Sequence, residues 1–408
     1  MQNKFAYFST GLSFLGGLFT IVGILFSHFL ISFGTILLAL SLAFQKNSGN
    51  RPILLFFLLL FFISLIFSVL QNQWLVDYTM LKFSYVLFGI IAYRSSTFQP
   101  SIVRFIFLVF IFLISVINIL SVANYILNFQ SINESLLKSK SIPILADVEH
   151  IYFGLLSCFC SLSLLYFLFF KGKSSNILSR QWLIVLFGLN FLCIHILSSR
   201  TGLLVLYTGL ASLLIIQSIK NSSKKFFVIS MAGIIVLPVL SFFIFPSFKN
   251  KVYNSMEDYH ALIKRENVNH KSMAQRVESW RATYWCILEK PWVGWSKKEE
   301  GKTLAFGYQA TNSQLINSNR LDVHNQFLAE AFFRGIFGLI LFLFFIGYWL
   351  HYLKNSPLSV SYTIGLLLAM ILEPLLERQL GFVVFFFLPI LALKLEQKKN
   401  RNIDLSQR

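Results

Sequence analysis

His324 and Asn325 stand where the chain passes from a long polar stretch back into an apolar one, in RLDVHNQFLAEAFFRGIFGL, which begins at Arg320. Asp322 is predicted to cap a helix there, which places His324 and Asn325 in its first turn. The positive end of a helix favours neutral imidazole, and neutral imidazole can accept a proton. The alternative role is structural, an interfacial histidine bonded to a neighbouring carbonyl group.

Two arginines could place positive charge near the same membrane face. Arg200, in LSSRTGLL, has few polar neighbours between two apolar segments, so it must reach the headgroups or pair with an anion. Arg276 begins a predicted amphipathic helix. A planar guanidinium group suits phosphate oxygens, so both residues are candidates for a phosphate site. Snorkelling of Arg200 to lipid phosphate and a solvated helix face for Arg276 are the alternatives.

Asn325 is a candidate supporting residue beside His324. Glu377 and Arg378, in LLERQLG, are two more. They could hold Arg200 or His324 in place, or simply pair with each other as a surface salt bridge. The remaining histidines show no ligand spacing, and the four cysteines show neither zinc spacing nor a disulfide framework. The sequence therefore predicts no metal site and no cofactor.

The composition requires that these residues be positioned by membrane helices. Hydrophobic residues make up 56% of the 408 residues and charged residues only 13%, whereas charged residues make up about 25% of soluble domains. Repeated apolar segments are long enough to cross a hydrocarbon core of ~30 Å as helices. The predicted fold is an all-α polytopic membrane protein with about twelve transmembrane helices. The predicted spans are 7–26, 28–44, 53–70, 75–93, 102–127, 150–170, 182–198, 201–219, 226–245, 331–352, 359–376 and 379–395.

The distribution of lysine and arginine predicts the orientation of these spans. With both termini in the cytoplasm, most basic residues of the short loops fall inside. The short outside loops keep only Lys82, Lys138, Lys140, Arg200 and Arg378. The net charge of +18 is then explained largely by loops that face anionic lipid, and no nucleic-acid partner is predicted.

Four regions follow from this topology: residues 1–245 with nine helices, an extracytoplasmic loop 246–330, three helices in 331–395, and a basic cytoplasmic tail 396–408. Within the loop, SMAQRVESWRATYWCILEK is predicted to form an amphipathic helix on or near the membrane surface, and KPWVGW to end it. The polar stretch from Lys297 to Arg320 is expected to be either a mobile loop over a substrate cleft or a connector without a role.

The order of these segments resembles the O-antigen ligase and O-antigen polymerase family of bacterial envelope glycosyltransferases. SSRTGLLVLYTGL is similar to the family's Ser-Arg-Thr helix start, and RVESWRATYWCILEKPWVGW to its Arg, Trp and Pro-x-x-Gly segment. HNQFLAEAFFRGIFGL is similar to its His-Asn-x-x-Leu segment. After Pro-x-x-Gly the family usually has another Gly, whereas this chain reads GWSKKEEG.

The resemblance implies a glycan donor carried on undecaprenyl diphosphate, transferred at the periplasmic face of the cytoplasmic (inner) membrane without metal or nucleotide sugar. By motif position, His324 is implied as the base or as the residue that orients the acceptor, and Arg200 and Arg276 are implied as the diphosphate-binding pair. A ligase would transfer the glycan to lipid A core in lipopolysaccharide biosynthesis. A polymerase would transfer it to a second lipid-linked chain, and a third class to Ser or Thr of exported proteins. A transporter of lipid-linked glycans is the alternative from another class.

Overall fold

The computed structural model describes residues 2–43, 49–71, 76–137, 141–170, 177–221, 224–264, 268–269 and 271–396, and the regular structure of these residues is helical. Eleven long helices run through the bundle: α1 (Gln2–Phe26), α2 (His28–Ala43), α3 (Arg51–Leu70), α4 (Val76–Tyr93), α5 (Pro100–Leu127), α7 (His150–Phe169), α8 (Arg180–Leu197), α9 (Arg200–Asn221), α10 (Lys224–Ile244), α14 (Gln326–Leu353) and α15 (Pro357–Leu372). A further rod combines α16 (Gln379–Phe382), a π-helical turn (Val383–Phe387) and α17 (Leu388–Glu396).

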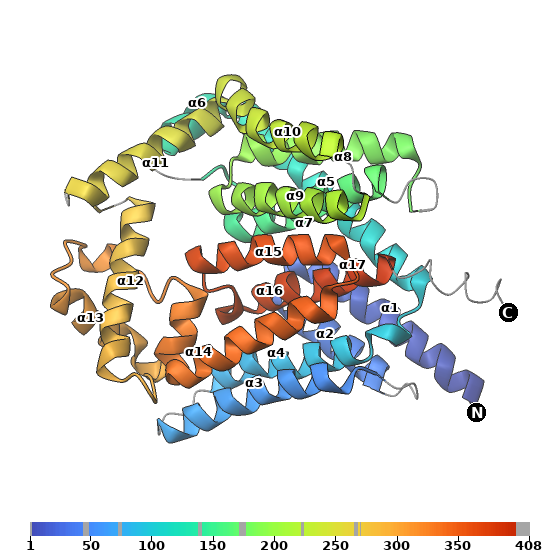
Figure 1. The fold of residues 1–408 in the computed structure, drawn as a ribbon, viewed down its shortest axis with the longest axis horizontal. Coiled ribbons are helices and arrows are strands. Elements are labelled where there is room, and N and C mark those ends of the chain that lie inside the picture. Colours follow the sequence, from blue (N-terminus) through green and yellow to red (C-terminus); the bar gives the residue numbers. More distant parts are fainter. Residues whose placement is uncertain are drawn as a thin grey trace.

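Helices α6 (Phe129–Leu137), α11 (Pro246–Lys264), α12 (Ser272–Glu289) and α13 (Glu300–Ala310) lie together at one end of this bundle. The start of α1 and the end of α17 point to the opposite end (Figure 1). Short 3-10 turns cover Ser95–Thr97, Lys297–Glu299, Asn317–Asn319 and Leu375–Glu377. We call the α11–α13 end the outer end.

Each predicted span coincides with a helix of the bundle, and the chain is an all-α polytopic membrane protein. In the described part, eight helices are long and apolar enough to cross a membrane, and a pair bent by 102° between Met231–Ile244 and Pro246–Lys264 makes up to nine. His28–Ala43 and Pro357–Leu372 are shorter apolar helices. Twelve crossings therefore stay a prediction, as do the cytoplasmic termini. The predicted tail lies outside the described residues beyond Glu396.

Two helix boundaries, the start of α14 and the end of α15, differ from the predicted ones because of the residues at these helix ends. The span predicted at 331–352 begins at Gln326, since the Asn325 side chain caps α14. The span predicted at 359–376 ends at Leu372, because Pro374 cannot continue a helix and Glu373 before it adopts an extended conformation. These two corrections place the ends of α14 and α15 together at the outer end.

Residues 297–320, at the outer end, contain regular structure, whereas the sequence suggested a mobile loop there. Between Lys297 and Arg320 the chain forms a 3-10 turn, α13 and a second 3-10 turn. Apolar residues of α12, α13 and α14 share one buried cluster, which includes Ala282, Leu304 and Phe332. Helix α12 coincides with the predicted helix and ends where KPWVGW begins, and its position at the membrane surface stays a prediction. The segment is therefore not an irregular loop, since Leu304 is buried between α13 and α12, and a gating role for it stays a prediction.

Helix α14 is broken at Gly335, which has φ 62° and ψ −172°. Only glycine readily adopts this conformation. The break frees two backbone groups, and the turn after α12 binds both: Trp295 N donates to Phe332 O at 2.7 Å, and Ile336 N donates to Pro291 O at 2.8 Å. The Pro-x-x-Gly segment is therefore a docking turn that fixes α12 to the outer half of α14.

Candidate active site

Arg200 is placed by a tight junction between α8 and α9. Ser198 ends α8 in a left-handed conformation with φ 47°, and α9 begins at Arg200. Gly202 lies one turn into α9, where an added Cβ would approach Gly154 Cα of α7 to 2.8 Å. The helix start is thus held against α7, and Arg200 Nη1 binds Asp258 Oδ2 of α11 at 3.1 Å.

Asp258 also binds α12, the next helix at the outer end. Its Oδ2 accepts from Met273 N at 3.2 Å, at the start of α12. Its side chain is almost fully buried, whereas the Arg200 side chain is one-third exposed. The carboxylate therefore joins α9, α11 and α12 beside the first turn of α12, where Arg276 lies.

Arg276 is held from three directions. Its Nη1 donates to the Ser272 side chain, its Nε donates to Leu372 O at 3.2 Å, and its Nη2 donates to Glu373 Oε1. Leu372 and Glu373 form the end of α15. The first turn of α12 is thereby bound to the bundle through a charged contact.

Glu373 also binds His324. The distance from His324 Nε2 to Glu373 Oε2 is 3.0 Å, and the Trp280 indole donates to His324 O at 2.9 Å. His324 precedes the helix instead of standing in its first turn, because Asn325 Oδ1 accepts from Phe327 N and Leu328 N as the N-cap of α14. The prediction of Asp322 as N-cap was therefore wrong, although His324 does lie beside a helix N-terminus.

The carboxyl group of Glu373 is charged in this arrangement. Burial alone would raise its pKa, but the hydrogen bond and charge of His324 and the charge of Arg276 outweigh burial, so the pKa lies below its usual value. A depressed carboxyl pKa stabilises the fold above the ordinary pKa, and this contribution disappears as the pH falls through the lowered value. The contacts to Arg276 and His324 should thus persist at neutral and mildly acidic pH.

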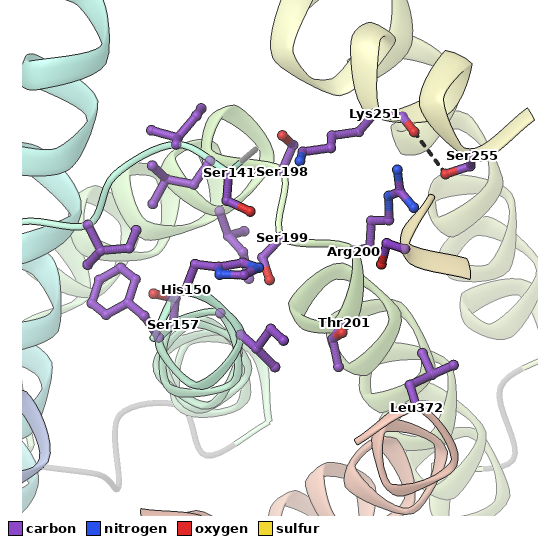
Figure 2. Close-up of a pocket in the computed structure, with 18 of the residues that line it drawn as sticks. Ser141, His150, Ser157, Ser198, Ser199, Arg200, Thr201, Lys251, Ser255 and Leu372 are labelled. Carbon is purple, nitrogen blue, oxygen red and sulfur yellow. Dashed lines mark hydrogen bonds between the residues drawn. The ribbon is translucent and has the colours of Figure 1, made fainter. Parts of the chain in front are cut away.

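A cavity of about 400 Å³ lies beside these groups at the outer end, and both Arg200 and Arg276 line it. Figure 2 shows its wall, with Ser198, Ser199, Arg200 and Thr201 along the α8–α9 junction and Leu372 at the end of α15. We call it the arginine cavity. His324 is not among its lining residues, and Glu373 links His324 to Arg276, which does line the cavity.

Residues 183–343 match the sequence model of a family described as O-antigen ligase. This segment of the chain is similar to O-antigen ligases. None of the curated protein sequences matches the chain.

The O-antigen ligase segment starts inside α8 and ends inside α14, so it includes Arg200, Arg276, His324 and the broken turn at Gly335. Glu373 lies beyond the matched residues. Glu373, at the end of α15, therefore brings a carboxylate to the site from outside the matched segment.

Two further candidates of this O-antigen ligase-like chain lie apart from the cavity. Glu377 Oε1 binds Lys82 Nζ at 2.7 Å in a buried contact, and exposed Arg378 binds Glu149. The alternative that Glu377 and Arg378 pair with each other was therefore wrong. A supporting role for either residue stays a prediction.

Sequence reasoning missed Asp258 and Lys251 in the matched segment, and Glu373 beyond it. No spacing pattern could have found them, because each faces residues of distant helices. In the described part of the chain no three His, Cys, Asp or Glu residues are grouped so as to hold a metal ion.

Proposed function

We propose that the protein transfers a glycan from undecaprenyl diphosphate to an acceptor hydroxyl group at the periplasmic face of the cytoplasmic membrane. The observation that carries the proposal is the position of Glu373, which binds both His324 and Arg276. A proton acceptor and a phosphate-binding cation are thereby fixed to one carboxylate. The match to O-antigen ligases supports the same chemistry.

Glycosyl transfer from such a donor requires that a diphosphate leave with its negative charge stabilised. Arg200 and Arg276 face one cavity from two helices, so they can bind the diphosphate from two sides. Each guanidinium group has five N–H donors. Their contacts to Asp258 and Glu373 therefore leave further donors for phosphate oxygens.

The acceptor hydroxyl must lose a proton as its oxygen attacks the anomeric carbon. When His324 Nε2–H donates to Glu373, Nδ1 is the ring atom that can accept this proton. The new bond forms between acceptor oxygen and anomeric carbon, and the electron pair of the broken carbon–oxygen bond goes to the departing phosphate. Attack opposite the leaving group inverts the anomeric configuration, so retention in the product would contradict a single displacement.

The lipid tail of the donor needs an opening towards the bilayer. An apolar groove of about 280 Å³ adjoins the arginine cavity. Its apolar wall comes from α9, α10 and α11 and consists of Leu203, Leu204, Tyr207, Pro238, Phe248 and Val252. The groove fits a polyprenyl chain whose diphosphate lies in the cavity.

The proposed acceptor is lipid A core, with a second lipid-linked chain or Ser and Thr of exported proteins as alternatives. A reconstituted assay offers purified protein, lipid-linked glycan donor and each acceptor separately. Product on lipid A core alone would support ligase activity, and product on another acceptor would reassign the class. Donor movement across the vesicle membrane without any transfer would instead indicate a transporter.

Replacement of Glu373 by Gln tests the shared carboxylate. We expect kcat to fall about 100-fold, since the neutral amide neither orients His324 as firmly nor balances Arg276. In a His324→Ala background the same replacement should have a much smaller effect, because the partner that it orients is gone. Equal effects in both backgrounds, measured as kcat under donor saturation, would show that Glu373 does not act through His324.

A further inference from the structure

Lys251 brings a third positive charge to the arginine cavity. It lies on α11, one turn before Asn254 and two turns before Asp258, on the face of α11 that is turned to the bundle. Its side chain lines the cavity together with Arg200 and Arg276. In Figure 2 the Lys251 side chain extends towards Ser198 at the α8–α9 junction.

Lys251 and Arg200 stand where the two spaces meet. The arginine cavity and the apolar groove share Ser198, Arg200, Lys251 and Ser255 as lining residues. Arg276 lines the cavity but is not among the groove residues, and it binds Glu373 next to His324. The cations are therefore arranged in sequence, from the apolar groove to the histidine.

Uncharged groups at this junction can also donate hydrogen bonds to an anion. The Ser198 hydroxyl is buried, lines both spaces and has no hydrogen-bond partner. The N-terminus of α9, a helix of 22 residues, lies at the same place. A helix N-terminus offers free backbone N–H groups and a positive dipole end to a phosphate.

We propose that Lys251 is a third cation of the donor site and, with Arg200, holds the phosphate nearest the lipid, whereas Arg276 holds the phosphate bonded to the sugar. This inference rests on the proposed function and adds the direction of the donor. The polyprenyl chain lies in the apolar groove, the two phosphates cross the cavity, and the anomeric carbon faces His324.

Replacement of Lys251 and replacement of Arg276 should have different kinetic effects, because the two residues bind different phosphates. The bond that breaks joins the anomeric carbon to the sugar-side phosphate, so new negative charge develops beside Arg276. The lipid-side phosphate keeps its charge throughout, so Lys251 binds donor and transition state equally. Loss of such uniform binding raises KM and leaves kcat nearly unchanged.

The charge of Lys251 also titrates near neutral pH. Burial and the positive charge of Arg200 lower its pKa, the charge of Asp258 opposes them, and the pKa is about 8. His150 of α7 and Arg276 of α12 also line the cavity. Donor binding by Lys251 should accordingly weaken as the pH rises above its pKa.

The test compares Lys251→Met and Lys251→Arg with wild type, and uses Lys249→Met as a control that removes a lysine of the same helix. Inorganic pyrophosphate binding is measured by calorimetry in nanodiscs near pH 7 and near pH 9, and KM and kcat are measured with the lipid-linked donor. Lys251→Met should weaken pyrophosphate binding and raise KM about tenfold or more. Lys251→Arg should restore binding and remove the extra loss at high pH, because arginine stays charged.

The outcomes separate the two proposals. Unchanged pyrophosphate affinity and KM in Lys251→Met, with transfer intact, would overturn the role of Lys251. A fall in kcat without a change in KM would overturn the assigned direction. Pyrophosphate binding that depends on Lys251 in a protein that transfers no glycan would support the phosphate site and overturn the proposed transferase function.

Discussion

Replacement of His324 by Ala should lower kcat for glycan transfer about 100- to 10,000-fold, the usual contribution of a general base. Donor binding should change little, because Arg200 and Arg276 keep their places around the arginine cavity. His324 lies before α14 and is 22% exposed, so its side chain is not part of the buried core. The measurement is a single-turnover assay with saturating donor and acceptor.

A second variant separates chemistry from folding. His324→Gln keeps a polar side chain beside Glu373 but cannot accept a proton in the same way, so it should be as inactive as His324→Ala. Unchanged pyrophosphate binding in both variants would show that the site is intact. Transfer within about threefold of wild type in either variant would exclude His324 as the base, since that change corresponds to less than ~1 kcal/mol of barrier.

Replacement of Gly335 by Ala should prevent correct folding of the outer end. An added Cβ would lie 2.2 Å from Trp292 O and 2.5 Å from Trp292 C, which are backbone atoms of the docking turn. The backbone conformation at Gly335 adds strain of about 1–3 kcal/mol for any other residue. We expect loss of most of the monodisperse protein in detergent, measured by size-exclusion chromatography and thermal unfolding.

Gly347→Ala is the matched control in the same helix. No atom lies within 4 Å of a Cβ built at Gly347. An alanine there improves helix propensity by up to ~1 kcal/mol and should leave yield and Tm unchanged or slightly raised. Normal yield and normal Tm for Gly335→Ala would mean that the break in α14 is not held by the docking turn.

The helices could be predicted from the sequence because long apolar segments are typical of helices that cross a membrane. The twelve predicted spans coincide with twelve helical segments, and the amphipathic helix from Ser272 was placed correctly. Helix α13 was missed because the stretch around it is rich in Gly, Ser, Asn, Thr and Gln, and its Leu304 and Tyr308 are buried in a cluster shared with α12 and α14. Local pattern carries no information about such a partner.

Part of the candidate site could also be predicted from local sequence. Arg200, Arg276 and His324 stand in short motifs, and the structure joins Arg276 to His324 through Glu373. Glu373 and Asp258 are single carboxylates in ordinary surroundings in the sequence. Their roles arise only when the end of α15 and the face of α11 meet α12, which depends on the packing of helices far apart in the chain.

The two arginines that line the arginine cavity are each paired with a carboxylate. Asp258 and Glu373 neutralise Arg200 and Arg276 before any substrate arrives, so the ligand-free site carries less unbalanced charge than two bare guanidinium groups would. An incoming diphosphate must share these cations with resident carboxylates, which lowers its net gain in binding. In the proposed reaction the spent carrier is itself a diphosphate and would share them in the same way. Its release would thereby be easier, so the paired carboxylates would protect turnover from inhibition by the product.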